Sequence, residues 1–409
     1  MSLRACRFCK APLQITFCDL GMSPLSNAFV KPAEAHLSES FYPLHAFVCE
    51  SCFLVQLEQF ETPEHIFGDY VYFSSYSDSW LAHCQQYAET MRTVLALGPQ
   101  SLVIEVASND GYLLQYFKRA GIPVLGIEPA RNVAAAAEQK GISTLSEFFG
   151  STLAIRLAQE GRRADLVIAN NVMAHVPDLN DFVAGLRQVL KPSGVLTVEC
   201  PHLLKLIEEQ QFDTIYHEHF SYFSFTTASR VLAHHGLTVH DVEQLPTHGG
   251  SLRIHASTQE AGHPAHPRVA AMLEEERRAG LGQPEIYASF SEKAKRTKRA
   301  LLTFLIETKN ADKRVVGYGA PAKGNTLLNY CGIRTDLLEY TVDRSPHKQG
   351  LLLPGTRIPV FGPAKIMETK PDYVLILPWN LQDEICTQMA GIRDWGGKFV
   401  VPIPAVAIL

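Results

Sequence analysis

The sequence lacks the features that mark membrane, secreted and nucleic-acid-binding proteins. No apolar run among its 409 residues reaches the length of a membrane span, and the opening stretch MSLRACRFCK lacks the apolar core of a secretion signal. The formal net charge of −5 gives no basic field for a nucleic acid polymer or an anionic membrane. We therefore expect a cytoplasmic protein that binds neither, and any anionic ligand must be held by local groups.

The cysteines do not form a disulfide framework, because their number is odd, nine, in a long chain with no secretion signal. Two Cys-x-x-Cys pairs, at Cys6 and Cys9 and at Cys49 and Cys52, instead supply the four thiolates that tetrahedral Zn²⁺ prefers. Four thiolates close the coordination shell, so the predicted zinc is structural. Free buried cysteines or redox pairs are the alternatives, but neither pair follows the βα pattern of a redox motif. Cys18 is expected to be a small core residue.

A chain of this length exceeds what one hydrophobic core usually organises, so two or three domains are expected. Cysteine pairs and short β-like runs mark residues 1–68. After residue 100, apolar strands alternate with helix-like segments, which predicts a doubly wound parallel sheet within residues 69–258. Residues 268–310 are typical of helix, and a second βαβ-like series completes residues 259–409. The predicted fold class is α/β.

The first strand-to-helix turn of the middle region lacks the glycines of a dinucleotide site. Residues 103–114, VIEVASNDGYLL, form an apolar strand, a polar turn and the start of a helix. A dinucleotide fingerprint needs G-x-G-x-x-G there, but Ala107 and Asn109 occupy two of the positions and only Gly111 remains. The turn therefore lacks the usual grip on a pyrophosphate.

Acidic residues end the first two strands of this region. Glu105 ends the first strand, and Glu128 ends the second, where a carboxylate can bond vicinal ribose hydroxyls. Glu147, Phe148 and Phe149 follow in the next segment and are placed to flank an adenine. This set suits S-adenosylmethionine, which has a ribose and an adenine but no phosphate. An ordinary parallel-sheet turn would need neither acid.

Residues 216–224, YHEHFSYFS, gather titratable side chains near the middle of the chain. A metal site is one interpretation, but His217 and His219 share a face only in an extended segment, and the H-E-x-x-H spacing is absent. A packed turn is another interpretation. A proton-transfer site is the third, and the clustering favours it because buried titratable groups are costly without a purpose.

Residues 317–326, GYGAPAKGNT, form a second glycine-rich loop between a predicted strand and a helix. Main-chain N–H groups and a lysine in such a loop can hold an anion. The residues concerned are Gly317, Gly319, Gly324 and Lys323. With Asp343 at the end of the next strand, the loop also permits an NAD-dependent oxidoreductase. Glycine turns of a purely structural kind are the third alternative.

In combination, several motifs resemble the S-adenosylmethionine-dependent sugar C-methyltransferases. They are the paired CxxC, EVASNDGYLL, GIEPA, NNVMAHVPD, YHEHFSYFS, THGGSLR, GYGAPAKGNT and GGKFVVPIP. These enzymes add a methyl branch to C3 of dTDP-linked 4-keto-deoxysugars, with relatives acting at C5. The resemblance implies a zinc-bearing N-terminal domain, a class I methyltransferase domain and a C-terminal Rossmann-like domain. It spans essentially the whole chain, and the nucleotide sugar would lie across the last two domains.

Methylation at carbon requires a base for the C3 proton and donors for the enolate oxygen. The resemblance implies that His219 is the base, that Glu218 is a neighbouring carboxylate and that Tyr216 donates near the C4 oxygen. His175 is expected in the same cleft. The segment GDYVYFSSYS offers a further tyrosine, for which Tyr70 is preferred over Tyr72 and Tyr76.

The resemblance also extends the two predicted binding sets. Further cofactor contacts are expected from Ala107, Asn109, Asp110, Gly111, Pro129 and Asn170. Expected substrate contacts are Tyr72, Tyr222, Arg253, Gly319, Lys323, Asn325, Asp343 and Arg344. The expected partner is a dTDP-linked nucleotide sugar bound by a monomer. An NAD-dependent oxidoreductase and a non-catalytic zinc-stabilised binding module are the competing functions.

Overall fold

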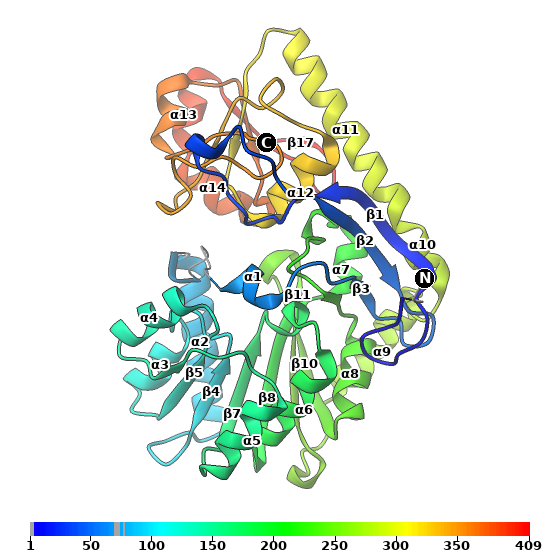
Figure 1. Ribbon diagram of the computed structural model, residues 1–409, viewed down its shortest axis with the longest axis vertical. Helices are drawn as coiled ribbons and strands as arrows, with labels where there is room; N and C mark the ends of the chain where they lie inside the picture. The colour runs from blue at the N-terminus through cyan, green and yellow to red at the C-terminus, as the bar shows by residue number, and fades with distance from the viewer. Residues whose placement is uncertain (1–3, 69–73, 77) are drawn as a thin grey trace.

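Three β-sheets organise the protein (Figure 1), whose computed structural model describes residues 4–68, 74–76 and 78–409. The middle sheet lies at the bottom of the view and the C-terminal sheet at the top. The N-terminal strands lie beside both. Within the described residues, no helix combines the length and the apolar character needed to cross a membrane.

The N-terminal sheet is antiparallel and has the strand order β1-β2-β3-β9. Its fourth strand comes from the middle of the chain, since Val55 pairs with Tyr222 and Gln56 with Ser221. Part of the motif YHEHFSYFS therefore supplies the last strand of the sheet formed by the cysteine-rich N-terminal region. The elements are β1 (Ile15–Ser23), β2 (Tyr42–Val48), β3 (Val55–Leu57), β9 (Ser221–Tyr222) and helix α1 (Pro63–Phe67).

The middle sheet confirms the predicted doubly wound α/β fold. Its order is β10-β11-β8-β7-β4-β5-β6, in which β4 to β8 are parallel and β10 and β11 are antiparallel. The strands are β4 (Val103–Val106), β5 (Val124–Ile127), β6 (Thr144–Leu145), β7 (Ala164–Asn170), β8 (Leu190–Pro201), β10 (Leu237–Leu245) and β11 (Ser251–Thr258).

Helices cover both faces of this sheet because its central strands are apolar on both sides. Val103 belongs to a core cluster with side chains of α2, α3 and α4, whereas the next residue, Ile104, belongs to a cluster with α5, α6 and α8. Alternate residues of a strand face opposite sides, so the two clusters lie on opposite faces. The helices are α2 (Asp78–Val94), α3 (Leu114–Arg119), α4 (Arg131–Gln139), α5 (Ser151–Gln159), α6 (Leu179–Val189), α7 (Leu203–Glu208) and α8 (Phe225–His234).

The C-terminal region forms the predicted Rossmann-like sheet, in the order β14-β13-β12-β15-β16-β17 with only β17 antiparallel. The segment predicted to be helical forms three helices, of which the long α11 runs up to this sheet (Figure 1). The strands are β12 (Val315–Tyr318), β13 (Thr341–Val342), β14 (Val360–Phe361), β15 (Tyr373–Ile376), β16 (Lys398–Val401) and β17 (Ala407–Ile408). The helices are α9 (Pro267–Arg278), α10 (Pro284–Ala288), α11 (Phe290–Asn310), α12 (Ala322–Cys331), α13 (Ala364–Thr369) and α14 (Gln382–Gln388).

Candidate active site

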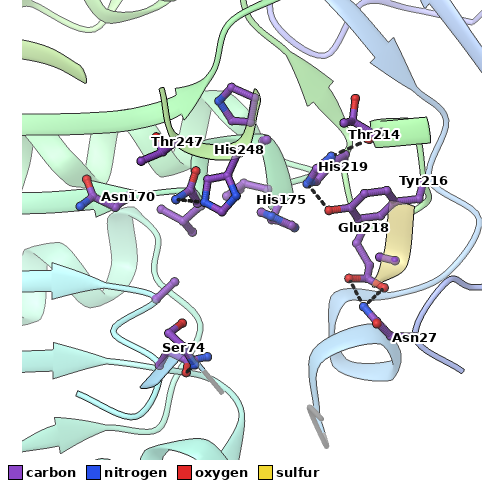
Figure 2. A pocket seen from close by; sticks show the side chains of 18 of the residues that line it. Asn27, Ser74, Asn170, His175, Thr214, Tyr216, Glu218, His219, Thr247 and His248 are labelled. Carbon is purple, nitrogen blue, oxygen red and sulfur yellow. Dashed lines mark hydrogen bonds between the residues drawn. The ribbon is translucent and has the colours of Figure 1, made fainter. Parts of the chain in front are cut away.

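A cavity of about 910 Å³ lies where the three regions meet (Figure 2). The residues that line this cavity form its wall. Asn27 of the N-terminal region, Ala107 of the middle region and Lys323 of the C-terminal region all belong to the wall. The cavity lies at the carboxyl ends of β4 and β12, each of which is the strand where the order of its parallel sheet reverses. Ligands of α/β folds bind at such points.

The loop after β4 adopts left-handed backbone at alternate residues. The φ angles are 58° at Ala107, 48° at Asn109 and 75° at Gly111. Asparagine tolerates this conformation better than alanine, which pays roughly 1–2 kcal/mol for it. Gly111 is required for a different reason, because a Cβ there would lie 2.8 Å from Cγ1 of Ile142. Ala107 and Asn109 belong to the wall, whereas Gly111 packs beneath the loop.

The two strand-ending acids play different parts in the structure. Glu128 belongs to the wall, and its Oε2 and Oε1 accept hydrogen bonds from the backbone N–H groups of Asn109 (3.0 Å) and Ala130 (2.9 Å). Burial raises the pKa of Glu128. Glu105 lies behind the loop and is not part of the wall, and its burial raises the pKa of its carboxyl well above the usual range. Glu128 is therefore the acid that a ligand can reach.

The cofactor side of the wall also contains Pro129, Phe148, Phe149 and Asn170. Within the described residues, Oδ1 of Asn170 is buried without a hydrogen-bond partner, so it can accept from a ligand. The described wall contains no lysine or arginine from the middle region. A carboxylate, an amide oxygen and aromatic rings without a phosphate grip suit the ribose, amine and adenine of S-adenosylmethionine.

Both ring nitrogens of His219, a wall residue, have hydrogen-bond partners. Its Nδ1 lies 2.8 Å from the carbonyl oxygen of Thr214, and its Nε2 lies 2.7 Å from the hydroxyl of Tyr216 (Figure 2). A carbonyl oxygen only accepts, so Nδ1 carries the proton and Nε2 of the neutral ring is the acceptor. Burial and the neighbouring His175 hold the pKa of His219 well below its usual value. The ring is consequently neutral, and its Nε2 is the acceptor atom.

His175 lies beside His219, whereas the carboxylate of Glu218 points towards Asn27 (Figure 2). The rings of His175 and His219 are 4.6 Å apart, and burial lowers the pKa of His175 to about 4. Both carboxylate oxygens of Glu218 accept from the side-chain amide of Asn27, at 2.8 Å each. The wall thus contains Tyr216, Glu218, His219 and His175 together, as the sequence predicts.

The other members of YHEHFSYFS do not face this cavity. His217 packs its ring near Tyr42 and Phe60, and its Nε2 lies 3.2 Å from the carbonyl oxygen of Pro43. Tyr222 is buried in β9 and is not part of the wall. Among the described residues, only the four cysteines gather three or more potential metal ligands closely enough, so the metal interpretation of this segment is not supported.

His248, a half-buried wall residue in the motif THGGSLR, was not identified from the sequence. Its φ of 56° is left-handed, and its Nε2 lies 3.4 Å from Nδ2 of Asn171. The ring lies 5.2 Å from that of Trp80, and burial lowers the pKa of His248 to about 4. The only indication of this residue in the sequence is its position between a threonine and two glycines.

A buried ion pair supports the wall behind His248. The carboxylate of Glu199 accepts from Arg253 at 3.0 Å and from Thr247 at 3.0 Å, and it lies 3.2 Å from His83. Burial opposes the charge of Glu199, but His83 and Arg253 lower its pKa nevertheless. Arg253, a predicted substrate contact, is occupied by this pair and lies behind the wall.

On the C-terminal side, Lys323 reaches the cavity from the start of α12. Its Nζ donates to Oδ1 of Asn380 at 2.7 Å and lies 4.4 Å from the centre of the Trp379 ring. Burial lowers the pKa of Lys323 to about 8, although the buried carboxylate of Asp213 opposes the shift. Asp213 accepts from Nε1 of Trp379 at 2.7 Å. Lys348, which the sequence reasoning missed, is a second wall lysine.

Other predicted contacts serve the framework around the wall. Asp110 pairs with Lys140, Glu147 with Arg156, and Arg344 with Glu384. Several predicted site residues are therefore not part of the wall, namely Glu105, Asp110, Gly111, Glu147, Tyr222, Arg253, Gly319, Asn325, Asp343 and Arg344. Tyr70 and Tyr72 lie outside the described residues, as does the side chain of Tyr76.

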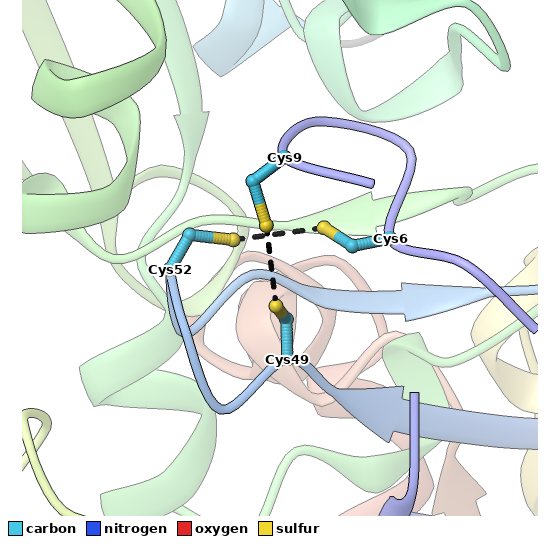
Figure 3. Close-up of side chains that lie close together, drawn as sticks. All are labelled: Cys6, Cys9, Cys49 and Cys52. Atoms are coloured by element: carbon cyan, nitrogen blue, oxygen red, sulfur yellow. Dashed lines mark hydrogen bonds between the residues drawn. The ribbon is translucent and has the colours of Figure 1, made fainter. Parts of the chain in front are cut away.

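The four cysteines form a compact cluster (Figure 3). Their Sγ atoms all lie within 4.8 Å of one another, with 3.6 Å between Cys6 and Cys52 and 3.5 Å between Cys9 and Cys49. Tetrahedral Zn²⁺ with Zn–S bonds of about 2.3 Å separates its sulfurs by about 3.8 Å. Nε2 of Gln56 donates to Sγ of Cys6 at 3.2 Å, which favours a thiolate. The cluster therefore fits Zn²⁺.

The two cysteine pairs sit in matching turns. In the first, the N–H of Cys6 donates to the oxygen of Ala11, and in the second, Cys49 donates to Leu54 at the same spacing. The residue after each pair, Lys10 or Phe53, has a left-handed φ of 65° or 60°. Two identical turns that present four thiolates to one point are typical of a structural zinc site.

Comparisons with known proteins agree with this three-part structure. Profiles described as "Putative zinc binding domain", "Methyltransferase domain" and "C-methyltransferase C-terminal domain" match residues 6–67, 81–242 and 246–404. The C-methyltransferase NovU of Streptomyces niveus is 36% identical over 405 residues, which cover 99% of this chain and 96% of NovU. The similarity thus extends over nearly the full length of both proteins.

More distant similarities cover only part of the chain. A ubiquinone biosynthesis O-methyltransferase of Bartonella tribocorum is 30% identical over 97 residues, 24% of this chain and 39% of that protein. The crystal structure of magnesium protoporphyrin IX methyltransferase from Synechocystis PCC 6803 with bound S-adenosylmethionine covers 48% of this chain and 88% of its own. The two sequences are 18% identical, and the TM-score is 0.33.

Proposed function

Since the chain belongs to the S-adenosylmethionine-dependent C-methyltransferases with an N-terminal zinc-binding domain, we propose that it methylates C3 of a dTDP-linked 4-keto-deoxysugar. The observation that carries this proposal is one cavity whose wall contains Glu128 of the middle region, Lys323 of the C-terminal region, and both Tyr216 and His219. The predicted residue ranges 1–68, 69–258 and 259–409 remain our proposed domains. A monomer in the cytoplasm is part of the same proposal.

The cofactor supplies an electrophilic methyl group, and the protein must create a nucleophilic carbon. A C4 ketone makes the C3 hydrogen acidic, so removal of that proton would give an enolate whose C3 could take up the methyl group as its bond to sulfur breaks and S-adenosylhomocysteine leaves. In the proposal, Nε2 of His219 takes the proton, because Nδ1 already holds one for Thr214. The Tyr216 hydroxyl, which lies 2.7 Å from this Nε2, turns its hydrogen towards the C4 oxygen and stabilises the developing charge.

Glu218 and Lys323 complete the proposed electrostatics. Burial disfavours the imidazolium that forms on His219, and in the proposal the carboxylate of Glu218, which lines the same cavity, offsets part of that charge. Lys323 and the start of α12 face the anionic nucleotide part of the substrate. Asp343, the acid of the alternative NAD interpretation, lies off the wall, and its Oδ2 is 3.7 Å from Nζ of Lys348.

The test is exchange of the C3 hydrogen with deuterated water, measured by NMR across dTDP- and GDP-linked 4-ketosugars. We expect His219→Asn to lower exchange and methyl transfer at least about 100-fold, the range seen on loss of a general base. His217→Asn is the matched control, because this histidine lies two positions away and off the wall. Undiminished exchange in His219→Asn would remove His219 as the base.

Two further measurements separate the proposal from its alternative. Calorimetry should detect S-adenosylhomocysteine binding and no NAD binding, and tight NAD binding would contradict the assignment of both loops. Because the pKa of His219 lies well below its usual value, the exchange rate should stay level from pH 7 to below pH 6.5. A fall centred near pH 6.5 would indicate an ordinary, exposed histidine as the base.

A further inference from the structure

The carboxylate proposed to balance the base is held by a residue of the zinc-binding region. Asn27 lies in the segment between β1 and β2, and it belongs to the cavity wall (Figure 2). Its Nδ2 donates to both carboxylate oxygens of Glu218, Oε1 and Oε2, at 2.8 Å each. Hydrogen bonds to a charged acceptor are roughly twice as strong as neutral ones.

The segment that carries Asn27 is anchored at the junction of all three regions. The carbonyl oxygen of Ser26 accepts from Nδ2 of Asn325 at 2.6 Å, and Oγ of Ser26 lies 3.5 Å from Oγ1 of Thr326. Thr326 in turn donates to the carbonyl oxygen of Ile215, the residue before Tyr216. Asn325, predicted to contact the substrate, instead fixes the backbone beside Asn27.

The zinc-binding region also holds the other end of the segment that contains Glu218. Strand β3 pairs with β9, and the N–H of Leu57 donates to the carbonyl oxygen of Phe220 at 3.0 Å. Strand β3 follows Cys52 within a few residues, and the carbonyl oxygen of Cys52 accepts from Oγ1 of Thr227 at 3.0 Å. The cysteine cluster is therefore connected by short, hydrogen-bonded paths to the residues that follow Glu218 in the chain.

We infer that Asn27 is a positioning residue, through which the zinc-binding region holds the Glu218 carboxylate in place on the cavity wall that it shares with the catalytic histidine. The inference rests on the proposed function, in which Glu218 offsets the charge of protonated His219. That charge is fully developed only after proton removal, so a displaced carboxylate weakens the transition state more than it weakens substrate binding. The zinc-binding region then contributes to catalysis as well as to folding.

The first test compares Asn27→Ala with Asn180→Ala. Asn180 is a matched control because its amide also joins the zinc-binding region to the rest of the chain, through the carbonyl oxygens of Arg7 and Phe8, but away from the wall. For Asn27→Ala we expect kcat to fall about 10-fold or more with KM within about twofold, since small misplacements of catalytic groups cost up to 100-fold. Zinc content and S-adenosylhomocysteine affinity should stay at wild-type levels in both variants, and Asn180→Ala should keep wild-type kcat.

A double-mutant cycle asks whether Asn27 acts through Glu218. In a Glu218→Ala background, Asn27→Ala should cost nothing further, because the group it positions is gone. Asn27→Asp should lower kcat below that of Asn27→Ala, since two carboxylates would then face each other. A full additional loss in the double variant would overturn the inference, as would equal loss of kcat in Asn180→Ala or wild-type kcat in Asn27→Ala.

Failure of the proposed function gives a different result. If wild-type protein exchanges no hydrogen in any ketosugar of the panel, the proposed reaction fails whatever Asn27 does. Crystal structures of Asn27→Ala and Asn180→Ala still test the positioning, because they require no turnover. We expect the Glu218 carboxylate to move in the first and to keep its place in the second, and an unmoved carboxylate in both would overturn the inference.

Discussion

The loops after β4 and β12 have the same topology and opposite chemistry. Each follows the strand at which a parallel sheet reverses its order, and each is braced by an acid at the end of the next strand. Glu128 accepts from the backbone of Asn109 in its loop, and Asp343 accepts from Ala320 in the other, at 3.0 and 2.7 Å. Each acid also accepts from the N–H two residues further along the chain.

The difference lies in what surrounds each acid. Glu128 reaches the cavity, whereas Asp343 stands behind Lys348, whose Nζ is 3.7 Å away and donates to the carbonyl oxygen of Ala320. The middle loop therefore offers a carboxylate to its ligand, and the C-terminal loop offers the ammonium groups of Lys323 and Lys348. The topology of each sheet thus places an acid beside each loop, but the neighbouring side chains determine which charge the loop presents to the cavity.

The largest expected effect separates the two acids. Glu128→Ala should weaken S-adenosylhomocysteine binding about 100-fold, because two charge-assisted hydrogen bonds to ribose hydroxyls are lost. Asp343→Ala should leave this affinity within about twofold, since Asp343 lies off the wall. Isothermal calorimetry measures both. Equal losses in the two variants would show that the loops do not divide the ligands as described.

The backbones of the loops should differ in their tolerance of a side chain. At Gly319, φ is 90° and a Cβ would lie 2.4 Å from Cδ of Pro378. Gly319→Ala should therefore lower the free energy of unfolding by about 2 kcal/mol. Ala107→Gly should change it by less than about 1 kcal/mol, because relief of the left-handed strain is largely offset by the greater conformational entropy of glycine in the unfolded chain. Urea denaturation followed by circular dichroism provides both values, and equal sensitivity would contradict the comparison.

Removing the cation of the C-terminal loop should affect one ligand only. Lys323→Met should raise the KM of the nucleotide sugar about 10-fold, which corresponds to one charge-assisted contact with an anion. S-adenosylhomocysteine affinity should remain unchanged, because this lysine approaches from the opposite side of the cavity. Steady-state kinetics and calorimetry together decide the matter. A selective loss of cofactor affinity would reverse the assignment of the two loops.

The smallest effect concerns pH. Burial lowers the pKa of Lys323 to about 8, so the side chain is charged below that pH and neutral above it. The KM of the nucleotide sugar should rise several-fold between about pH 7.5 and 9, because the neutral amine no longer attracts an anion. In Lys323→Arg the guanidinium stays charged, so KM should be flat over this range. A rise of the same size in this variant would place the titrating group elsewhere.

Those residues whose roles follow from local pattern were predictable. The CxxC spacing identified all four cysteines, because each pair lies in one short turn and the motif occurs twice. The strand, loop and helix around Ala107 and Asn109 were also predicted, because periodicity and position in a βαβ unit place this loop at the sheet edge. His219 and Tyr216 were found because their motif is short and their residue types suit one reaction.

Contacts between distant segments were not predictable from the same patterns. Asn27 lies 191 positions before Glu218, and nothing in PLSNAF indicates a partner in YHEH. Arg253 and Asn325 were predicted to touch the substrate, but buried partners, Glu199 and Ser26, occupy them. Residue type and position in a motif do not reveal which neighbour a folded chain brings to a polar side chain.

The sequence by itself determined the α/β class, the four cysteines of the cluster that fits zinc, the missing dinucleotide fingerprint of the first loop and the clustering of titratable groups in the histidine motif. All of these depend on residues close together in the chain, where spacing and backbone geometry restrict the outcome. The tertiary structure alone decided that β9 completes the N-terminal sheet, that Asn27 meets Glu218 and that Glu128 faces the cavity while Asp343 does not. These depend on packing across hundreds of residues, because each polar group takes whichever partner the assembled core leaves within reach.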